Sequence, residues 1–99
     1  MILFAYSWYD TKLKMYNSPN FLINDGAAHR QVEAMANDPG TEIGKFPNDF
    51  SLFKVGSFDT ENGVFTPLEG KVHVADANQY IQPQEDIFPN RQDRNNQVG

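Results

Sequence analysis

The sequence predicts an α+β fold, in which a small antiparallel sheet in β-β-α-β-β order carries one packed helix and a flexible C-terminal tail. Segments with an apolar alternation of period two lie before and after a single stretch with three- and four-residue apolar spacing. From about Asp76 onward the composition becomes polar and rich in amides. With 99 residues, the chain is long enough for one domain. We therefore expect a folded domain over residues 1–75 and a polar tail over residues 76–99.

The first expected strand covers Ile2 to Tyr9, an aromatic-rich segment with two alternating rows of side chains. We expect the bulkier row to face the core and the other row to be half solvated. The bulkier row comprises Ile2, Phe4, Tyr6 and Trp8, and the other comprises Leu3, Ala5, Ser7 and Tyr9. After a polar break at Asp10, Lys12 to Tyr16 alternates as a second strand with one solvated face. An extended segment resumes at Phe21 to Ile23.

One helix is expected, across Gly26 to Asn37, and no other segment is predicted to be helical. Asn24 and Asp25 are both suitable N-caps for it. Its apolar residues recur at three- and four-residue spacing and form a narrow stripe. The stripe consists of Ala28, Val32, Met35 and Ala36. The helix is expected to end before Pro39, because proline disfavours helical conformation in the preceding residue.

The second half is predicted to return to extended structure after a loop over Thr41 to Asp49. A strand is expected at Phe50 to Phe58, with apolar side chains on both faces. Phe50, Leu52 and Phe58 are assigned to one face, and Phe53 and Val55 to the other. A turn over residues 59–63, closed by Gly63 in a left-handed conformation, leads to a short strand at Val64 to Pro67. A weaker strand is expected at Lys71 to Ala75, where Lys71 and His73 alternate with Val72 and Val74.

The tail carries one candidate binding element. Nine of the residues from Asn78 to Gly99 are Asn or Gln, a composition that buries too little apolar surface to offset the cost of ordering the chain. We expect this segment to be flexible unless a partner orders it. Ile87 and Phe88, followed by Pro89, are a candidate partner-binding segment for a sheet edge or groove, and simple disorder is the alternative.

Charge and composition narrow the possible functions. The net charge is −5, with eight Lys and Arg against thirteen Asp and Glu, so a basic face able to hold duplex DNA is not expected. Cysteine is absent, which excludes disulfides and thiolate sites. The longest uncharged apolar run, Met1 to Tyr9, is far short of a membrane helix. These features predict a soluble protein with no membrane partner.

The first hairpin contains the best candidate site, a combination of aromatic and basic residues. These residues are Trp8, Tyr9, Lys12, Lys14 and Tyr16. Single-stranded nucleic acid is held by aromatic faces that stack on bases and by cations that follow the backbone, which an alternating ribbon can present together. The alternative is that Trp8 and Tyr16 are core or edge aromatics while the lysines protect a strand edge from aggregation.

No catalytic, metal or cofactor site is predicted. His29 and His73 lie on different expected elements and lack the spacing of a metal motif. Asp59 and Glu61 lie in a turn that lacks the pattern of a calcium loop. The sequence contains neither a nucleophile-elbow motif nor a glycine-rich phosphate loop. We therefore do not expect an enzyme, and we expect no cofactor.

Three stretches of the sequence carry a family resemblance. They are the hairpin of Ile2–Asp10 and Lys12–Tyr16, the helical segment from Asn24–Ala28 through Val32 to the stop at Asn37–Pro39, and the stretch Phe46–Asp59 with its Glu61–Gly63 turn. Over roughly residues 1–75 they resemble the small nonstructural proteins of gokushovirus-type microviruses, which are single-stranded DNA phages. The sequence departs from that family at Phe46, where a His commonly precedes the proline, and its tail is longer than many.

The resemblance implies a viral protein of the bacterial host cytoplasm, with suggested roles in single-strand synthesis or genome packaging, and it brings no catalytic residues. Our first hypothesis is accordingly an accessory protein that engages single-stranded DNA through the first hairpin. The second hypothesis is a protein-interaction module that binds a viral or host protein or forms a homodimer. It rests on the apolar second face at Phe53 and Val55 and on the segment Ile87–Phe88.

Overall fold

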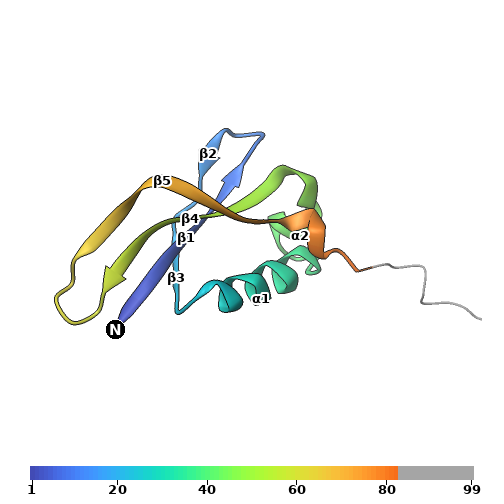
Figure 1. Ribbon diagram of the computed structural model, residues 1–99. Coiled ribbons are helices and arrows are strands. Elements are labelled where there is room, and N and C mark those ends of the chain that lie inside the picture. The colour runs from blue at the N-terminus through green and yellow to red at the C-terminus, as the bar shows by residue number, and fades with distance from the viewer. Residues whose placement is uncertain (83–99) are drawn as a thin grey trace, which may run out of the picture.

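The computed structural model describes residues 1–82 and contains a five-stranded antiparallel sheet in the order β2-β1-β4-β5, with β3 also paired to β1. The strands are β1 (Ile2–Asp10), β2 (Met15–Tyr16), β3 (Asn20–Leu22), β4 (Phe50–Asp59) and β5 (Phe65–Asp76). Helix α1 (Asp25–Ala36) lies along one side of the sheet, and the β1–β2 turn projects on the other side (Figure 1). The predicted α+β fold with one main helix on an antiparallel sheet is confirmed.

The core lies between α1 and the sheet. Tyr6 and Leu52 are fully buried there, and Trp8 meets Phe50 edge to face with ring centroids 6.4 Å apart. Strand β1 has Trp8 opposite Leu52 of β4, so the two central strands present adjacent large side chains to the helix. The helix contributes Ala28, Val32 and Ala36, the residues of the predicted stripe that become buried. Small residues on the helix allow it to approach the aromatic side chains of β1 closely.

Helix α1 begins one residue before the predicted start, because Asn24 rather than Asp25 caps it. The Asn24 side-chain oxygen accepts a hydrogen bond from the backbone N–H of Ala27 at 2.9 Å. At the other end, the Asn37 side chain donates to the backbone carbonyl of Tyr80 at 2.7 Å and accepts from the backbone N–H of Gln82 at 2.8 Å. Asn37 therefore ties the end of the helix to the last described residues.

The prediction of a single helical segment is wrong, because two short helical turns occupy the expected loop. They are α2 (Glu42–Lys45) and the 3₁₀ turn η1 (Pro47–Asp49). Thr41 caps α2 by accepting from the backbone N–H of Gly44 at 2.9 Å, and Ile43 is buried against the core. Position 44 accepts only glycine, because a Cβ there would lie 1.9 Å from the Asp38 carbonyl oxygen.

The predicted second strand is much shorter than Lys12 to Tyr16. The Asp10 carboxylate accepts hydrogen bonds from the backbone N–H groups of Lys12 and Leu13, at 2.9 and 3.2 Å, which folds these residues into a turn. Lys14 closes that turn with a φ of 58°, in the left-handed region. Of the residues from Lys12 to Tyr16, only Met15 and Tyr16 pair with β1.

A bulge in β4 changes which side chains share a face. Tyr6 pairs with Lys54 whereas Ala5 pairs with Gly56, so Val55 is an extra residue without a partner on β1. Beyond the bulge the alternation is shifted by one residue. Phe58 therefore lies on the side away from α1, and its predicted place beside Phe50 and Leu52 is wrong.

The two short strands expected after residue 63 are one continuous strand, β5. Gly63 adopts the predicted left-handed conformation, with a φ of 74°, in the turn that precedes it. The register of β5 against β4 shifts twice, and residues 68–71 form the larger irregularity, between the pairs Gly56–Pro67 and Lys54–Val72. Pro67 and Val72, on either side of this irregularity, are both paired with β4, so the strand continues where the sequence indicates a break.

The folded region extends past the predicted boundary at residue 75. The 3₁₀ turn η2 (Ala77–Tyr80) follows β5 directly, and Ala77 is fully buried in the core. The Tyr80 hydroxyl lies 2.5 Å from Nδ1 of His29 on α1. Residues 83–99 of the predicted tail, including Ile87 and Phe88, lie outside the described residues. None of the helices within residues 1–82 is long and apolar enough to cross a membrane.

Candidate nucleic-acid interface

The side of the sheet opposite α1, called the open face below, carries two groups of aromatic rings. The aromatic residues of both groups lie on this side because each of them is paired across the sheet with a residue of β1 or β4 whose side chain points away from α1. The first group, the mixed cluster, consists of Tyr9, Tyr16, Phe53 and His73. The second group, the phenylalanine cluster, consists of Phe21, Phe58 and Phe65. The sheet thus has a packed side and a side on which aromatic rings are partly accessible.

In the mixed cluster, each ring touches the next across four different strands. Ring centroids are 4.8 Å apart for Tyr9 and Tyr16, 5.9 Å for Tyr16 and Phe53, and 5.4 Å for Phe53 and His73. The side chain of Lys71 adds a positive charge, with Nζ 5.6 Å from the centre of the Tyr16 ring. Tyr16 and His73 are exposed, so the cluster offers ring surface to a ligand.

The phenylalanine cluster lies towards the other end of β1. Phe21 contacts Phe58 and Phe65, with centroids 5.6 and 6.3 Å apart. Phe65 lies over Gly56, where a Cβ would come within 2.4 Å of its ring, so a glycine is required at that position. Phe21 and Phe65 are 44% and 42% exposed, which leaves an apolar surface. The nearest acidic residue in sequence is Asp59, next to Phe58.

The structure brings together only part of the predicted site. Tyr9 and Tyr16 are in contact on the open face, as the predicted combination requires. Trp8 is 3% exposed and belongs to the core on the other side of the sheet, so it offers no ring face to a base. Its indole N–H is buried without a hydrogen-bond partner among the described residues. For Trp8 the alternative interpretation, a core aromatic, is the one that the structure shows.

The two predicted lysines are exposed in the β1–β2 turn, but they are not part of the mixed cluster. Lys12 lines a surface pocket of about 260 Å³ together with the acidic residues Glu42 and Asp49. Lys14 is exposed at the end of the turn. Lys71, on β5, is the lysine that contacts a ring of the cluster.

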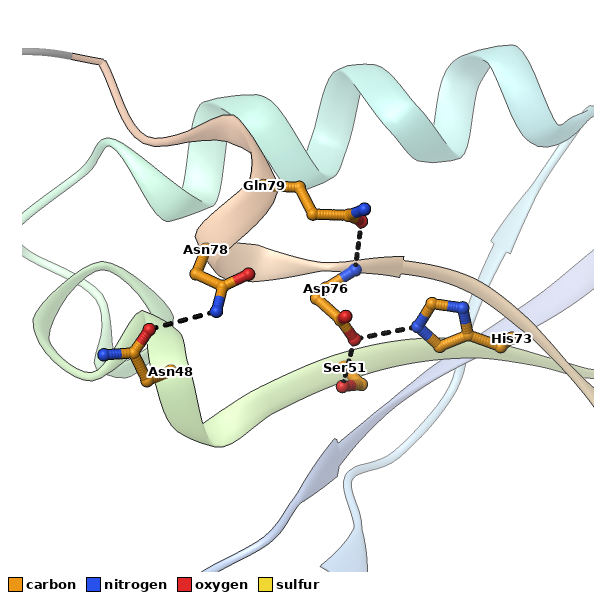
Figure 2. Close-up of polar contacts among 6 residues, drawn as sticks. All are labelled: Asn48, Ser51, His73, Asp76, Asn78 and Gln79. Atoms are coloured by element: carbon orange, nitrogen blue, oxygen red, sulfur yellow. Dashed lines mark hydrogen bonds and ion pairs between the residues drawn. The ribbon is translucent and has the colours of Figure 1, made fainter.

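A hydrogen-bonded group joins β4 to β5 beside the mixed cluster. The Ser51 hydroxyl donates to Oδ1 of Asp76 at 2.6 Å, and Nε2 of His73 lies 2.8 Å from the same oxygen (Figure 2). The hydrogen bond from Ser51, followed by that from His73, holds the pKa of Asp76 below its usual range. Because the carboxylate lies between the serine and the histidine, His73 is not placed to remove a proton from Ser51. These hydrogen bonds therefore orient His73 and link β4 to β5.

Next to this group, hydrogen bonds hold η2 against the end of β5 and against the 3₁₀ turn η1. The backbone N–H of Asp76 donates to the side chain of Gln79 at 2.7 Å, and Asn78 donates to Asn48 at 3.0 Å (Figure 2). These contacts fix the end of β5, and with it the position of His73 and Asp76.

A second polar group lies at the start of α1. The Tyr6 hydroxyl donates to Oδ1 of Asp25 at 2.6 Å, and Nζ of Lys54 lies 3.1 Å from the same atom. Burial, and then the hydrogen bond to Asp25, raises the pKa of Tyr6. The hydrogen bond from Tyr6 and the nearby Lys54 lower the pKa of Asp25. Since Lys54 points to this side of the sheet, it adds no charge to the open face.

Two residues of the mixed cluster, Phe53 and His73, were not among the predicted site residues, and neither was the neighbouring Lys71. The alternation in the sequence already placed Lys71 and His73 on one face of a strand and Phe53 on the second face of another. What the sequence did not show is the register, Phe53 opposite His73, that joins these faces. Within residues 1–82, no group of three or more His, Asp or Glu side chains is arranged to hold a metal ion.

Comparison with known proteins places the chain in a protein family. Residues 3–80 fit the family model described as Phage ORF5 protein, a span that runs from β1 through α1 to the end of η2. No curated protein and no solved structure matches the chain. The match covers most of the chain and includes every residue of the mixed cluster.

Proposed function

Because this chain belongs to the phage ORF5 protein family, we propose that it is a nonstructural accessory protein that binds single-stranded DNA through the mixed cluster during phage genome synthesis or packaging. On this proposal the phage is a gokushovirus-type microvirus, and the protein acts in the cytoplasm of its bacterial host. The three stretches of sequence that resemble nonstructural proteins of those phages support the assignment to that type.

The observation that carries the proposal is the mixed cluster with its neighbouring lysine. Aromatic side chains contribute about 1–3 kcal/mol per stacked base, and they do so with little dependence on sequence. Tyr16 presents an exposed ring from the edge of the sheet, and Lys71 supplies a cation at that ring for the backbone. With a net charge of −5 and few cations on this face, the protein is suited to short single strands at low salt rather than to duplex DNA.

Fluorescence anisotropy with a labelled oligothymidine at low salt tests the proposal. Tyr16→Ala is expected to weaken binding by about five- to a hundredfold, the loss of one stacked base. Phe46→Ala is the matched control, since Phe46 is 52% exposed but lies between α2 and η1, away from the cluster. Failure to bind at high micromolar protein, or equal binding by the Tyr16 variant, contradicts the proposal.

Lysine variants give a second test of the same site. Lys71→Gln is expected to lower the slope of log K against log salt by about 0.7, the contribution of one phosphate contact on a single strand. Lys45→Gln is the control, because Lys45 is exposed in the last turn of α2 and outside the open face. An unchanged slope for the Lys71 variant would show that this lysine does not contact the backbone.

The phenylalanine cluster favours a second candidate function, a protein-interaction module. Among residues 1–82, no lysine lies over the exposed rings of this cluster as Lys71 lies over Tyr16, and a second copy of the chain is the partner that we propose for it. Sedimentation velocity is expected to show a homodimer that Phe65→Ala converts to monomer, with Phe46→Ala as control. A wild-type protein that sediments as a monomer at high micromolar concentration excludes this function for the cluster.

The predicted role of Ile87 and Phe88 in capturing a viral or host protein stays a prediction, since both residues lie outside the described part of the chain. Co-purification of such a partner with the full chain, compared with a chain that ends at residue 82, is the measurement that tests it. Equal recovery of the partner with both chains contradicts the role.

A further inference from the structure

The chain has two histidines, and their surroundings differ sharply. His73 lies on the open face with its side chain 47% exposed, and its ring packs edge to face against Phe53. His29 is on α1, on the other side of the sheet, where its Nδ1 meets the Tyr80 hydroxyl in a partly buried contact. Only His73 therefore belongs to the proposed nucleic-acid interface, and His29 is a natural control for it.

The contact with Asp76 fixes the chemistry of the His73 ring. An ionised carboxylate can only accept hydrogen bonds, so Nε2 of His73, 2.8 Å from Asp76 Oδ1, must carry the hydrogen. In the neutral ring, Nδ1 is then an acceptor, and it has no hydrogen-bond partner among residues 1–82. Protonation turns Nδ1 into a charged donor. A phosphate oxygen, which only accepts, has no bond to make with the neutral ring and gains one with the protonated ring.

The charged groups around His73 are few. Strand β5 carries three other charged residues, namely Asp76, which pairs with His73, Lys71, whose Nζ lies over the Tyr16 ring, and the exposed Glu69. Strand β4 contributes the uncharged Phe53, while its Lys54 points to the opposite side of the sheet. The four residues of η2 carry no charge at neutral pH. Protonation of His73 adds one positive charge to the mixed cluster, beside Phe53 and Asp76.

We propose that His73 is a proton-sensitive phosphate contact of the open face, so that the affinity of this protein for single-stranded DNA rises as the pH falls through the histidine range. The inference rests on the proposed function and deepens it by naming a control of the same site. Among side chains, histidine is the usual one to gain a proton between about pH 8 and pH 5.

The experiment is an anisotropy titration of the full chain with labelled oligothymidine at pH 8 and pH 5.5, at fixed low salt. Wild-type affinity is expected to rise about two- to fivefold at the lower pH, the effect of one exposed charge. The slope of log K against log salt is expected to steepen by about 0.7. His73→Gln keeps a donor for Asp76 but does not titrate, so it should abolish both changes, whereas His29→Gln should retain them.

His73→Lys provides a further variant with a permanent charge. It is expected to bind at pH 8 about as tightly as the wild type binds at pH 5.5, and to show no change between the two. Equal pH dependence in the wild type and in a folded His73→Gln variant overturns this inference while leaving the proposed function intact. The absence of oligonucleotide binding at both pH values overturns the proposed function, and this inference with it.

Discussion

Replacing Tyr6 with Phe tests how the helix is held to the sheet. Tyr6 is fully buried, and its hydroxyl donates to Asp25 at 2.6 Å, in the first turn of α1. A hydrogen bond to a charged group contributes about 1.5–3 kcal/mol to stability. Asp25 is 53% exposed and keeps Lys54 at 3.1 Å, so water and the lysine replace part of the loss. The expected decrease in the free energy of unfolding is therefore about 1–2 kcal/mol.

The effect of Tyr6→Phe should depend on pH in a defined direction. The pKa of Asp25 is lowered below its ordinary value of 3.8 in the folded state, first by the hydrogen bond from Tyr6. Stability from such a group is present above the unfolded pKa and is lost as the pH falls through the folded pKa. The difference between wild type and variant should therefore be complete above about pH 5 and should shrink as the pH falls below about 4.

Urea unfolding at pH 7 and at pH 3 measures this difference without adding salt. At pH 7 the midpoint should fall by roughly 1 M, from the usual dependence of stability on urea for a small domain. Tyr9→Phe is the matched control, because the Tyr9 hydroxyl makes no hydrogen bond within residues 1–82. A Tyr6 variant no less stable than the Tyr9 variant, or a difference that is the same at both pH values, refutes the reasoning.

Three further substitutions test the core, the helix cap and the open face by the same urea measurement. Leu52→Ala should cost about 2–5 kcal/mol, because the side chain is fully buried between sheet and helix; a smaller loss would mean that the core refills. Asn24→Ala should cost about 1 kcal/mol through loss of the N-cap of α1, and no loss would show that water replaces it. Gly56→Ala should cost about 1–3 kcal/mol because its Cβ meets the Phe65 ring, whereas Gly70→Ala, with open space around it, should be tolerated; equal effects would contradict the packing.

The elements that local periodicity specifies were predictable. The stripe of α1 and the alternation of β1 are properties of a few neighbouring residues, so Val32 and Tyr6 were correctly assigned to the core. The short helix α2 was missed because its signals, a Thr41 cap and a glycine pressed against Asp38, have meaning only once the chain has folded back on α1.

The faces of β4 could be predicted only up to the bulge. Phe50 and Leu52 follow the alternation, but Val55 inserts an extra residue and moves Phe58 to the other side. Nothing in the local sequence marks Val55 as extra, because a bulge is defined by the partner strand. The same dependence on pairing explains why only part of the candidate site was found. Tyr9 and Tyr16 are close in sequence, whereas Phe53 and His73 meet through long-range register.

The irregular register of β5 has a consequence for how copies of the protein behave when crowded together. A free edge can recruit another chain only if its N–H and C=O groups form a continuous row, and β5 interrupts that row at residues 68–71 and again near Ala75. Pro67 removes one further donor. The β5 edge is therefore a poor template for adding another strand, and copies of the chain brought close together are less prone to pair edge to edge.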